Sequence, residues 1–191
     1  SEPMAAIILA GGASSRLGFD KRSLCVGGVP IVENLCAVLR QNCAQIIVGV
    51  DSKARLAPPG AEIVVDRRPG AGPMMALACC LAKSRFDLNL VVACDIPMLP
   101  LNVLLELSAR ALGRDGAIPV TAQGLLEPLF GVYRRSLLSR MEELLGSGER
   151  SLKSLIEAGD FARVALVPLG LDEIPNINTP EDLARFEALL S

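Results

Sequence analysis

The stretch AAIILAGGASSRLGFDK, which runs from Ala5 to Lys21, decides how the start of the chain is interpreted. Five apolar residues lead into two glycines, and an unbroken apolar run is typical of a strand buried on both faces of a sheet. Gly11 and Gly12 allow backbone N–H groups to approach a ligand closely, and Arg16 and Lys21 add charge-assisted donors that suit phosphate. The stretch therefore predicts a phosphate-binding loop after a buried strand. The alternative is an ordinary strand-to-helix turn with solvated charges.

Short apolar runs and helix-like segments alternate along the rest of the chain, and this alternation predicts a mostly parallel α/β sheet. In such sheets, ligands bind at the carboxyl ends of the strands. We expect one domain over residues 1–191, because this length supplies a single substantial core. The expected strands are 7–10, 46–50, 63–65, 90–94, 117–120, 129–133 and 164–167, and the expected helices are 30–43, 73–84, 100–112, 134–145, 151–158 and 180–190.

The composition argues against several classes of protein. The net charge of −2 disfavours a nucleic-acid binder, whose affinity would rest on many basic contacts with phosphate. Hydrophobic residues make up 51% of the chain, which disfavours disorder. The most apolar region, residues 88–105, is interrupted by Asp95, Pro97 and Pro100, so we expect no membrane span.

The chain contains no histidine, and this limits its chemistry. A Ser-His-Asp or Cys-His mechanism is excluded, and zinc has little support. The six cysteines lack C-x-x-C spacing, so we expect free buried thiols in the reducing cytoplasm, with disulfides as the alternative. Catalysis would have to rest on carboxylates, lysine, arginine, backbone amides and metal.

Acidic residues follow two of the expected strands. Asp95 comes directly after the apolar run in LVVACDIPMLP, where a carboxylate is costly without a partner. Mg²⁺ typically takes one or two protein carboxylates together with substrate phosphate oxygens, so Asp95 is a candidate Mg²⁺ ligand. The alternative is a structural turn before Pro97. Asp66 ends another strand, and the loop that contains Gly72 either approaches a base or sugar or is a plain turn.

Two asparagines occupy alternate positions shortly before the last expected helix. Residues at i and i+2 of an extended segment face the same side, so Asn176 and Asn178 predict a polar pocket, with turn chemistry as the alternative. The helix itself has a strong start, because Thr179 offers an N-cap hydroxyl and is followed by Pro180 and two acids.

Taken together, these segments resemble a known family. Residues 9–21 have the form L-A-G-G-x-S-x-R-x-G-x-D-K, which is similar to the signature of the molybdenum cofactor guanylyltransferases (the molybdopterin-guanine dinucleotide biosynthesis protein A family) of the nucleotidyltransferase superfamily. Further matches follow in the family's order: G-x-P at 28–30, opening the first helix, D and then G-P at 66–73, C-D-x-P at 94–97, and N-x-N-T-P-E-D-L at 176–183. The matches span residues 5–186. One departure is Ala76, where the family usually has the last glycine of G-P-[LM]-A-G.

The resemblance implies a Rossmann-like three-layer α/β/α fold and a function. That function is the transfer of GMP from GTP to molybdopterin, or to its molybdenum-loaded form, with release of pyrophosphate. Mg²⁺ is the implied cofactor, and delivery proteins or apo-molybdoenzymes are the implied transient partners, with no nucleic acid or membrane. The implied roles are catalysis for Lys21, Arg16 and Asp95, metal binding for Asp95, nucleotide binding for Leu9, Ala10, Gly11, Gly12, Lys21, Asp66, Gly72 and Asp95, and acceptor-side contacts for Asn176 and Asn178.

The resemblance favours GTP, because family members with L-A-G-G tend to use GTP and cytidylyl relatives tend to carry L-A-A-G. Ala76 leaves the choice between GTP and CTP open. The alternatives are a cytidylyltransferase for the same pterin, a guanylyltransferase for another small phosphate, and a non-catalytic nucleotide-binding or partner-binding module. The presence of Lys21, Asp95 and Asn178 together argues against the non-catalytic alternative.

Overall fold

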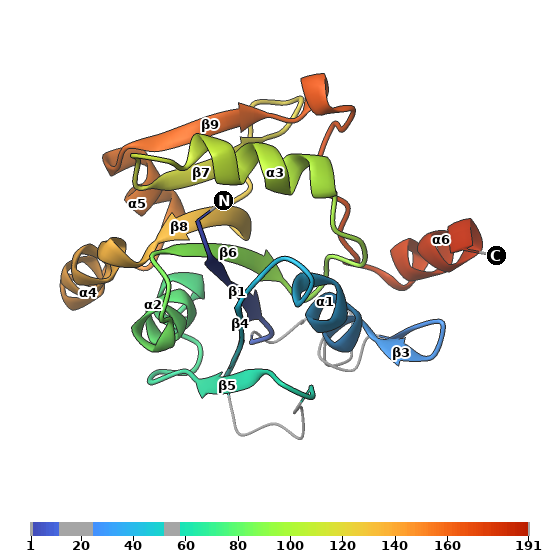
Figure 1. Ribbon diagram of the computed structural model, residues 1–191, viewed down its shortest axis with the longest axis horizontal. Coiled ribbons are helices and arrows are strands. Elements are labelled where there is room, and N and C mark those ends of the chain that lie inside the picture. Colours follow the sequence, from blue (N-terminus) through green and yellow to red (C-terminus); the bar gives the residue numbers. More distant parts are fainter. Residues whose placement is uncertain (1, 12–24, 52–57, 191) are drawn as a thin grey trace.

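The computed structural model describes residues 2–11, 25–51 and 58–190 (Figure 1). Within these residues, seven strands form a central sheet in the order β5-β4-β1-β6-β8-β7-β9. Neighbouring strands pair in parallel except around β8, which runs antiparallel to both β6 and β7. The expected mostly parallel sheet is confirmed. The strands are β1 (Met4–Leu9), β4 (Gln45–Val50), β5 (Glu62–Val65), β6 (Leu88–Ala93), β7 (Gly116–Val120), β8 (Phe130–Arg134) and β9 (Phe161–Ala165).

Helices cover both faces of this sheet and complete the expected three layers. On one face, α1 and α3 pack over a hydrophobic cluster, and on the other face α2, α4 and α5 pack over a second cluster. The last helix, α6, lies at one end of the molecule (Figure 1), where its Leu183 and Phe186 pack against the first of these clusters. The helices are α1 (Ile31–Leu39), α2 (Pro73–Lys83), α3 (Leu101–Arg110), α4 (Leu138–Gly146), α5 (Leu152–Ala158) and α6 (Pro180–Leu190), with short 3₁₀ turns η2 (Arg135–Leu137) and η3 (Val167–Leu169).

The apolar start of the chain is explained by its place in the middle of the sheet. Successive side chains of a strand point to opposite faces. Ala6 and Ile8 of β1 therefore join the cluster under α1 and α3, whereas Ile7 and Leu9 join the cluster under α2. Because both faces are covered, β1 has no position that favours a polar side chain.

A short hairpin precedes α1 and was missed by the sequence analysis. Strands β2 (Cys25–Val26) and β3 (Val29–Pro30) pair in antiparallel fashion. Gly27 and Gly28, which join them, have φ angles of 59° and 81°. A two-residue hairpin turn with positive φ at both positions favours glycine. Residues 28–30 lead directly into the first helix, as expected, because Pro30 ends the hairpin and is also the N-cap of α1, which begins at Ile31.

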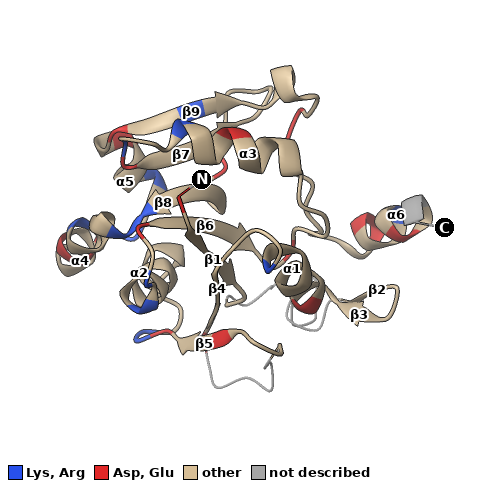
Figure 2. Cartoon of the chain, viewed as in Figure 1, with Lys and Arg blue, Asp and Glu red and all other residues tan. Residues whose placement is uncertain are grey.

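The start of α6 follows the expected capping pattern. The Thr179 hydroxyl accepts a hydrogen bond from the Asp182 N–H at 3.1 Å, and the Asp182 carboxylate accepts from the Thr179 N–H at 2.9 Å. These reciprocal bonds form a capping box and hold the entry to the helix rigidly. Figure 2 shows that α6 is mainly acidic, whereas lysine and arginine gather on the side that carries α2, η2 and α4.

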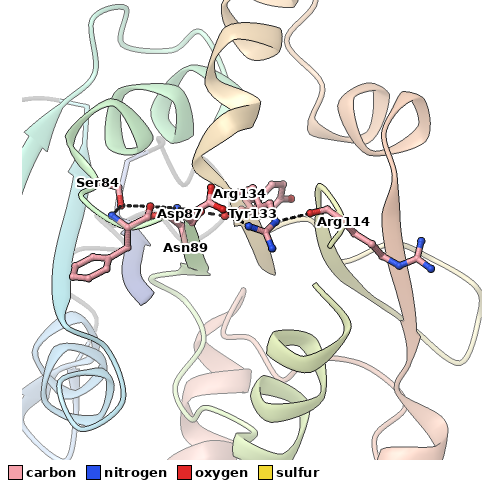
Figure 3. Close-up of polar contacts among 7 residues, drawn as sticks. Ser84, Asp87, Asn89, Arg114, Tyr133 and Arg134 are labelled. Carbon is pink, nitrogen blue, oxygen red and sulfur yellow. Dashed lines mark hydrogen bonds and ion pairs between the residues drawn. The ribbon is translucent and has the colours of Figure 1, made fainter. Parts of the chain in front are cut away.

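A polar network joins the amino end of β6 to the end of β8 (Figure 3). The buried Asn89 amide donates to the carbonyls of Phe86 at 3.1 Å and Asp87 at 2.9 Å. Asp87 forms an ion pair with Arg134, whose Nε also donates to the Arg114 carbonyl at 2.8 Å. These contacts fasten the antiparallel strand β8 to its neighbour at the edge of the sheet opposite the candidate site.

Candidate active site

The carboxyl ends of four parallel strands meet at one edge of the sheet. Leu9 of β1 lies beside Gly49 of β4 and Ala93 of β6, and the ladder continues past the strands. Cys94 N–H donates to the Leu9 carbonyl at 3.1 Å, and Asp66 N–H donates to the Val50 carbonyl at 2.8 Å. The residues that follow each strand are therefore held together at this edge, although they are far apart in the sequence.

A cavity of about 340 Å³ opens at this edge, and we call it the first cavity. It brings together five residues predicted for the nucleotide site, as well as Ala76, the departure from the family pattern. Ala10 is almost fully buried in the core beside the cavity and does not line it. Gly12, Arg16 and Lys21 lie outside the described residues. The lining consists of Leu9, Gly11, Asp51, Asp66, Gly70, Gly72, Pro73, Ala76, Ala93, Cys94, Asp95 and Leu129.

Gly72 shapes one wall of the first cavity. Its φ is 90°, a conformation that favours glycine, and it lies at the N-cap of α2 with Pro73 as the first helical residue. A side chain at this position would also meet Arg150, because an added Cβ would lie 3.6 Å from the Arg150 carbonyl oxygen. Sequence analysis missed Arg150, whose position beside this loop depends on the packing of distant segments.

Asp66 is half-buried in the first cavity. Its Oδ1 atom is inaccessible and has no hydrogen-bond partner among the described residues. Burial, and to a smaller extent the nearby Asp51, raises the pKa of this carboxyl to about 6. Asp51, which sequence analysis missed, follows β4 as Asp66 follows β5, and its backbone N would lie 3.2 Å from a Cβ added at Gly11. A side chain at Gly11 would therefore crowd the backbone of Asp51.

A second cavity, of about 270 Å³, adjoins the first. The two share Ala93, Asp95 and Leu129, so Asp95 stands where they meet. The second cavity contains both predicted asparagines, and the Asn178 amide donates to Asn176 Oδ1 at 2.8 Å. The predicted polar pocket therefore exists at this position. The lining consists of Ala93, Asp95, Ile96, Glu127, Pro128, Leu129, Phe130, Ile174, Asn176 and Asn178.

Residues 176–178, which contain both asparagines, are held by hydrogen bonds on both sides. Ile177 N–H donates to the Asp95 carbonyl at 2.8 Å, which ties the segment to the end of β6. On the other side, the Asp182 carboxylate accepts from the Asn178 N–H at 3.0 Å, and these backbone hydrogen bonds lower the pKa of Asp182. The capping box of α6 therefore also positions Asn178.

The donor atoms around Asp95 fit a hard divalent cation. A carboxylate and amide oxygens are the ligands that Mg²⁺ prefers, and substrate phosphate oxygens usually complete its coordination. The described residues do not bring three or more His, Cys, Asp or Glu side chains into a metal-binding group. The six cysteines are free thiols, as expected, and five of them are buried in the two hydrophobic clusters. Across the same described residues, no helix is both long and apolar enough to cross a bilayer.

A mostly parallel sheet between two helical layers, with a cavity at its carboxyl edge lined in part by Asp66 and Asp95, defines the Rossmann-like class of α/β proteins that bind nucleotides there. Within this class, the chain belongs to the family of the MobA-like NTP transferase domain, whose family model matches residues 6–164. The protein is therefore a nucleotidyltransferase.

Curated relatives and solved structures agree with this assignment. A probable molybdenum cofactor guanylyltransferase of Nostoc sp. is 35% identical over 193 residues, which cover 96% of this chain and 90% of the relative. One of the same name from Mycobacterium tuberculosis H37Rv is 32% identical over 169 residues, covering 86% and 84%. The molybdopterin-guanine dinucleotide biosynthesis protein A of Archaeoglobus fulgidus has the same fold, with a TM-score of 0.80, 24% identity, and coverage of 97% and 98%. A Mycobacterium tuberculosis protein solved in complex with manganese has a TM-score of 0.69 at 16% identity, covering 97% and 98%.

Proposed function

We propose that this protein transfers GMP from GTP to the terminal phosphate of molybdopterin, or of its molybdenum-loaded form, and releases pyrophosphate. The observation that carries the proposal is the pair of adjoining cavities with Asp95 between them. The first cavity takes GTP and the second takes the acceptor, so the two phosphates that react meet beside Asp95. The names of the curated relatives support this choice of substrates.

The reaction needs positioning more than it needs a strong base. An oxygen of the acceptor phosphate attacks the α-phosphorus of GTP, and a new P–O bond forms. The bond from that phosphorus to the bridging oxygen of the β-phosphate breaks, and its electron pair leaves with pyrophosphate. Because the acceptor phosphate is already a nucleophile, charge neutralisation and alignment supply the rate. This requirement suits a chain without histidine.

Different residues of the chain bind the nucleotide, neutralise the charge on its phosphates and hold the cation. Leu9, Gly11 and Gly12 receive the base and ribose through their backbone, and Asp66 and Gly72 complete that pocket. Ala10 is buried, and its N–H donates to the Gly49 carbonyl, which holds the start of this loop. Lys21 and Arg16 hold the triphosphate and offset the charge of the departing pyrophosphate. Asp95, with Asn176 and Asn178 beside it, would hold Mg²⁺, which when bound supplies Lewis-acid stabilisation of charge on phosphate oxygens. The manganese complex of the structural relative supports a divalent cation in this fold.

A pyrophosphate-release assay tests the proposal. The purified protein is given GTP, CTP or ATP, each with and without molybdopterin, in Mg²⁺ or in excess chelator. We expect release only with GTP, acceptor and metal together. Release with CTP instead would identify a cytidylyltransferase, a candidate that Ala76 in the wall of the first cavity keeps open. Release with GTP and a different phosphorylated acceptor, but not with molybdopterin, would identify a guanylyltransferase that acts on that other acceptor.

Three further parts of the proposal concern the protein's setting. They are a cytoplasmic location, one domain over the whole chain, and transient contact with delivery proteins or apo-molybdoenzymes. Co-purification of such a protein with the GTP-loaded enzyme would test the last of these.

A further inference from the structure

Glu127 lines the second cavity from the connection between β7 and β8. Its N–H donates to the Pro119 carbonyl at 3.0 Å, and its own carbonyl accepts from the Phe130 N–H at 3.1 Å. The carbonyl of the next residue, Pro128, accepts from the Tyr133 hydroxyl at 2.7 Å. The side chain therefore projects from a rigid part of the sheet edge, which preorganises it for a ligand.

Among residues 2–11, 25–51 and 58–190, no hydrogen bond or ion pair explains the position of the Glu127 carboxylate. It is half-buried, and in the part of the chain that the structure describes it forms no hydrogen bond or ion pair. Burial raises its pKa, and Glu173 and Asp95 raise it further. A carboxylate that is partly removed from water is costly unless hydrogen-bond donors compensate it. A ligand rich in donors would supply that compensation.

The charge of Glu127 restricts which part of the acceptor it can meet. A phosphate would be repelled by the carboxylate, so the acceptor phosphate belongs at the junction with the first cavity, where Asp95 would hold the cation. The pterin ring, by contrast, presents a ring N–H and an amino group side by side on its 2-amino-4-oxopyrimidine edge. Two parallel donors of this kind match the two oxygens of a carboxylate, as in bidentate arginine–carboxylate pairs.

We propose that Glu127 recognises the 2-amino-4-oxopyrimidine edge of the acceptor's pterin ring and so orients the acceptor with its phosphate toward Asp95. This inference rests on the proposed function, because it assigns one end of the proposed acceptor. It makes Glu127 a specificity-determining residue that acts in acceptor binding and leaves GTP binding unaffected.

Binding of a small pterin isolates this contact from catalysis. The probes are 6-hydroxymethylpterin and 6-hydroxymethyllumazine, in which a carbonyl replaces the 2-amino group, and their own fluorescence reports binding in the presence of GTP and Mg²⁺. The wild-type protein should prefer the pterin. Glu127→Gln should weaken pterin binding about tenfold or more and remove the preference. Glu173→Gln is the matched control, since Glu173 is exposed and is not among the lining residues, and it should change pterin binding by no more than about twofold.

Two results would overturn the inference. The first is equal affinity of the wild-type protein and Glu127→Gln for the pterin, including the case in which neither binds it at millimolar concentration. The second is a loss of Mn²⁺ affinity in Glu127→Gln with unchanged pterin binding, which would show that the carboxylate serves a cation.

Turnover separates failure of this inference from failure of the proposed function. With molybdopterin and GTP, Glu127→Gln should raise the KM for the acceptor about tenfold or more while leaving the KM for GTP unchanged. If the wild-type protein turns over and the variant keeps the wild-type acceptor KM, the Glu127 assignment fails and the function stands. If the wild-type protein releases no pyrophosphate with molybdopterin, the proposed function fails, whatever the pterin probes show.

Discussion

Polar side chains form different contacts at the amino end of β6 and at the carboxyl ends of the parallel strands, which we call the amino and carboxyl edges of the sheet. At the amino edge of β6, the Asn89 amide donates to two carbonyls, and Asp87 and Arg134 form an ion pair (Figure 3). A buried oxygen without a partner among the described residues occurs at both edges, as Asn89 Oδ1 and Asp66 Oδ1, but Asp66 lines the first cavity, where burial raises the pKa of its carboxyl. The first edge is organised for stability. The second retains hydrogen-bonding capacity, as expected where a ligand completes the contacts.

The largest expected effect comes from Asp95, at the junction of the two cavities. Asp95→Asn keeps the size of the side chain but removes the charge that would hold the cation. We expect pyrophosphate release to fall about a thousandfold or more, with the unfolding midpoint little changed. Asp87→Asn at the opposite edge is the control and should retain activity. Wild-type turnover in Asp95→Asn would show that Asp95 is not a ligand of the catalytic cation.

Substitution of Asn89, at the amino edge, should have the opposite effect: a loss of stability without a loss of activity. Asn89→Ala removes the amide that donates to the carbonyls of Phe86, Asp87 and Tyr133 and creates a small cavity, although Asn89 Oδ1 itself accepts nothing from the described residues. Urea unfolding should show a loss of about 2 kcal/mol. Turnover per folded molecule should stay at the wild-type value. A selective loss of turnover would contradict the division between the two edges.

Asp66 predicts a pH dependence of stability. Its pKa is raised from 3.8 to about 6 in the folded state, so the folded protein holds a proton that the unfolded chain has already released. The stabilising contribution of the neutral form is complete below pH 4 and is lost as the pH rises to about 6. Thermal unfolding of the ligand-free protein should therefore show falling stability over this interval, by about 1 kcal/mol after allowance for solvent.

Asp66→Asn should remove that pH dependence and weaken nucleotide binding above pH 6. A variant that keeps the wild-type pH profile would assign the dependence to another group. Glu127 is the first alternative to examine, because burial shifts its pKa in the same direction.

The smallest expected effect lies on the surface of the edge organised for stability. Arg114 and Asp160 form an ion pair of 2.6 Å, with 49% and 64% of their side chains exposed. Exposed pairs contribute little, so Arg114→Ala should change the free energy of unfolding by less than about 1 kcal/mol. A larger loss would show that the Arg134 contact to the Arg114 carbonyl depends on this side chain.

Most of the fold was predictable because it follows local patterns. Each expected strand and helix is present, but several ends are shifted. The strand expected at 7–10 begins earlier, at Met4, because nothing in an apolar run marks where pairing starts. The helix expected at 30–43 ends at Leu39, although Cys43 beyond it is buried and continues the apolar pattern. The β2–β3 hairpin was missed because two-residue strands have no periodicity to detect.

The candidate site was predictable where its residues directly follow strands. Asp66, Asp95 and Gly72 lie together as expected, and Asp51 could have been found by the same argument. Glu127 carried no such signal, because it reaches the site only through the antiparallel insertion of β8 between β6 and β7.

The hydrogen bond from Ile177 to the Asp95 carbonyl has a consequence for the order in which the chain is made. The lining of the first cavity is complete once Leu129 has been synthesised, whereas the second cavity also needs residues 174–178. All residues of the first cavity are therefore translated before residues 174–178 of the second, and a domain that folds as one unit gains both cavities only when this segment is present. A chain cut before residue 174 would have no place for an acceptor molecule, even if it captured a nucleotide.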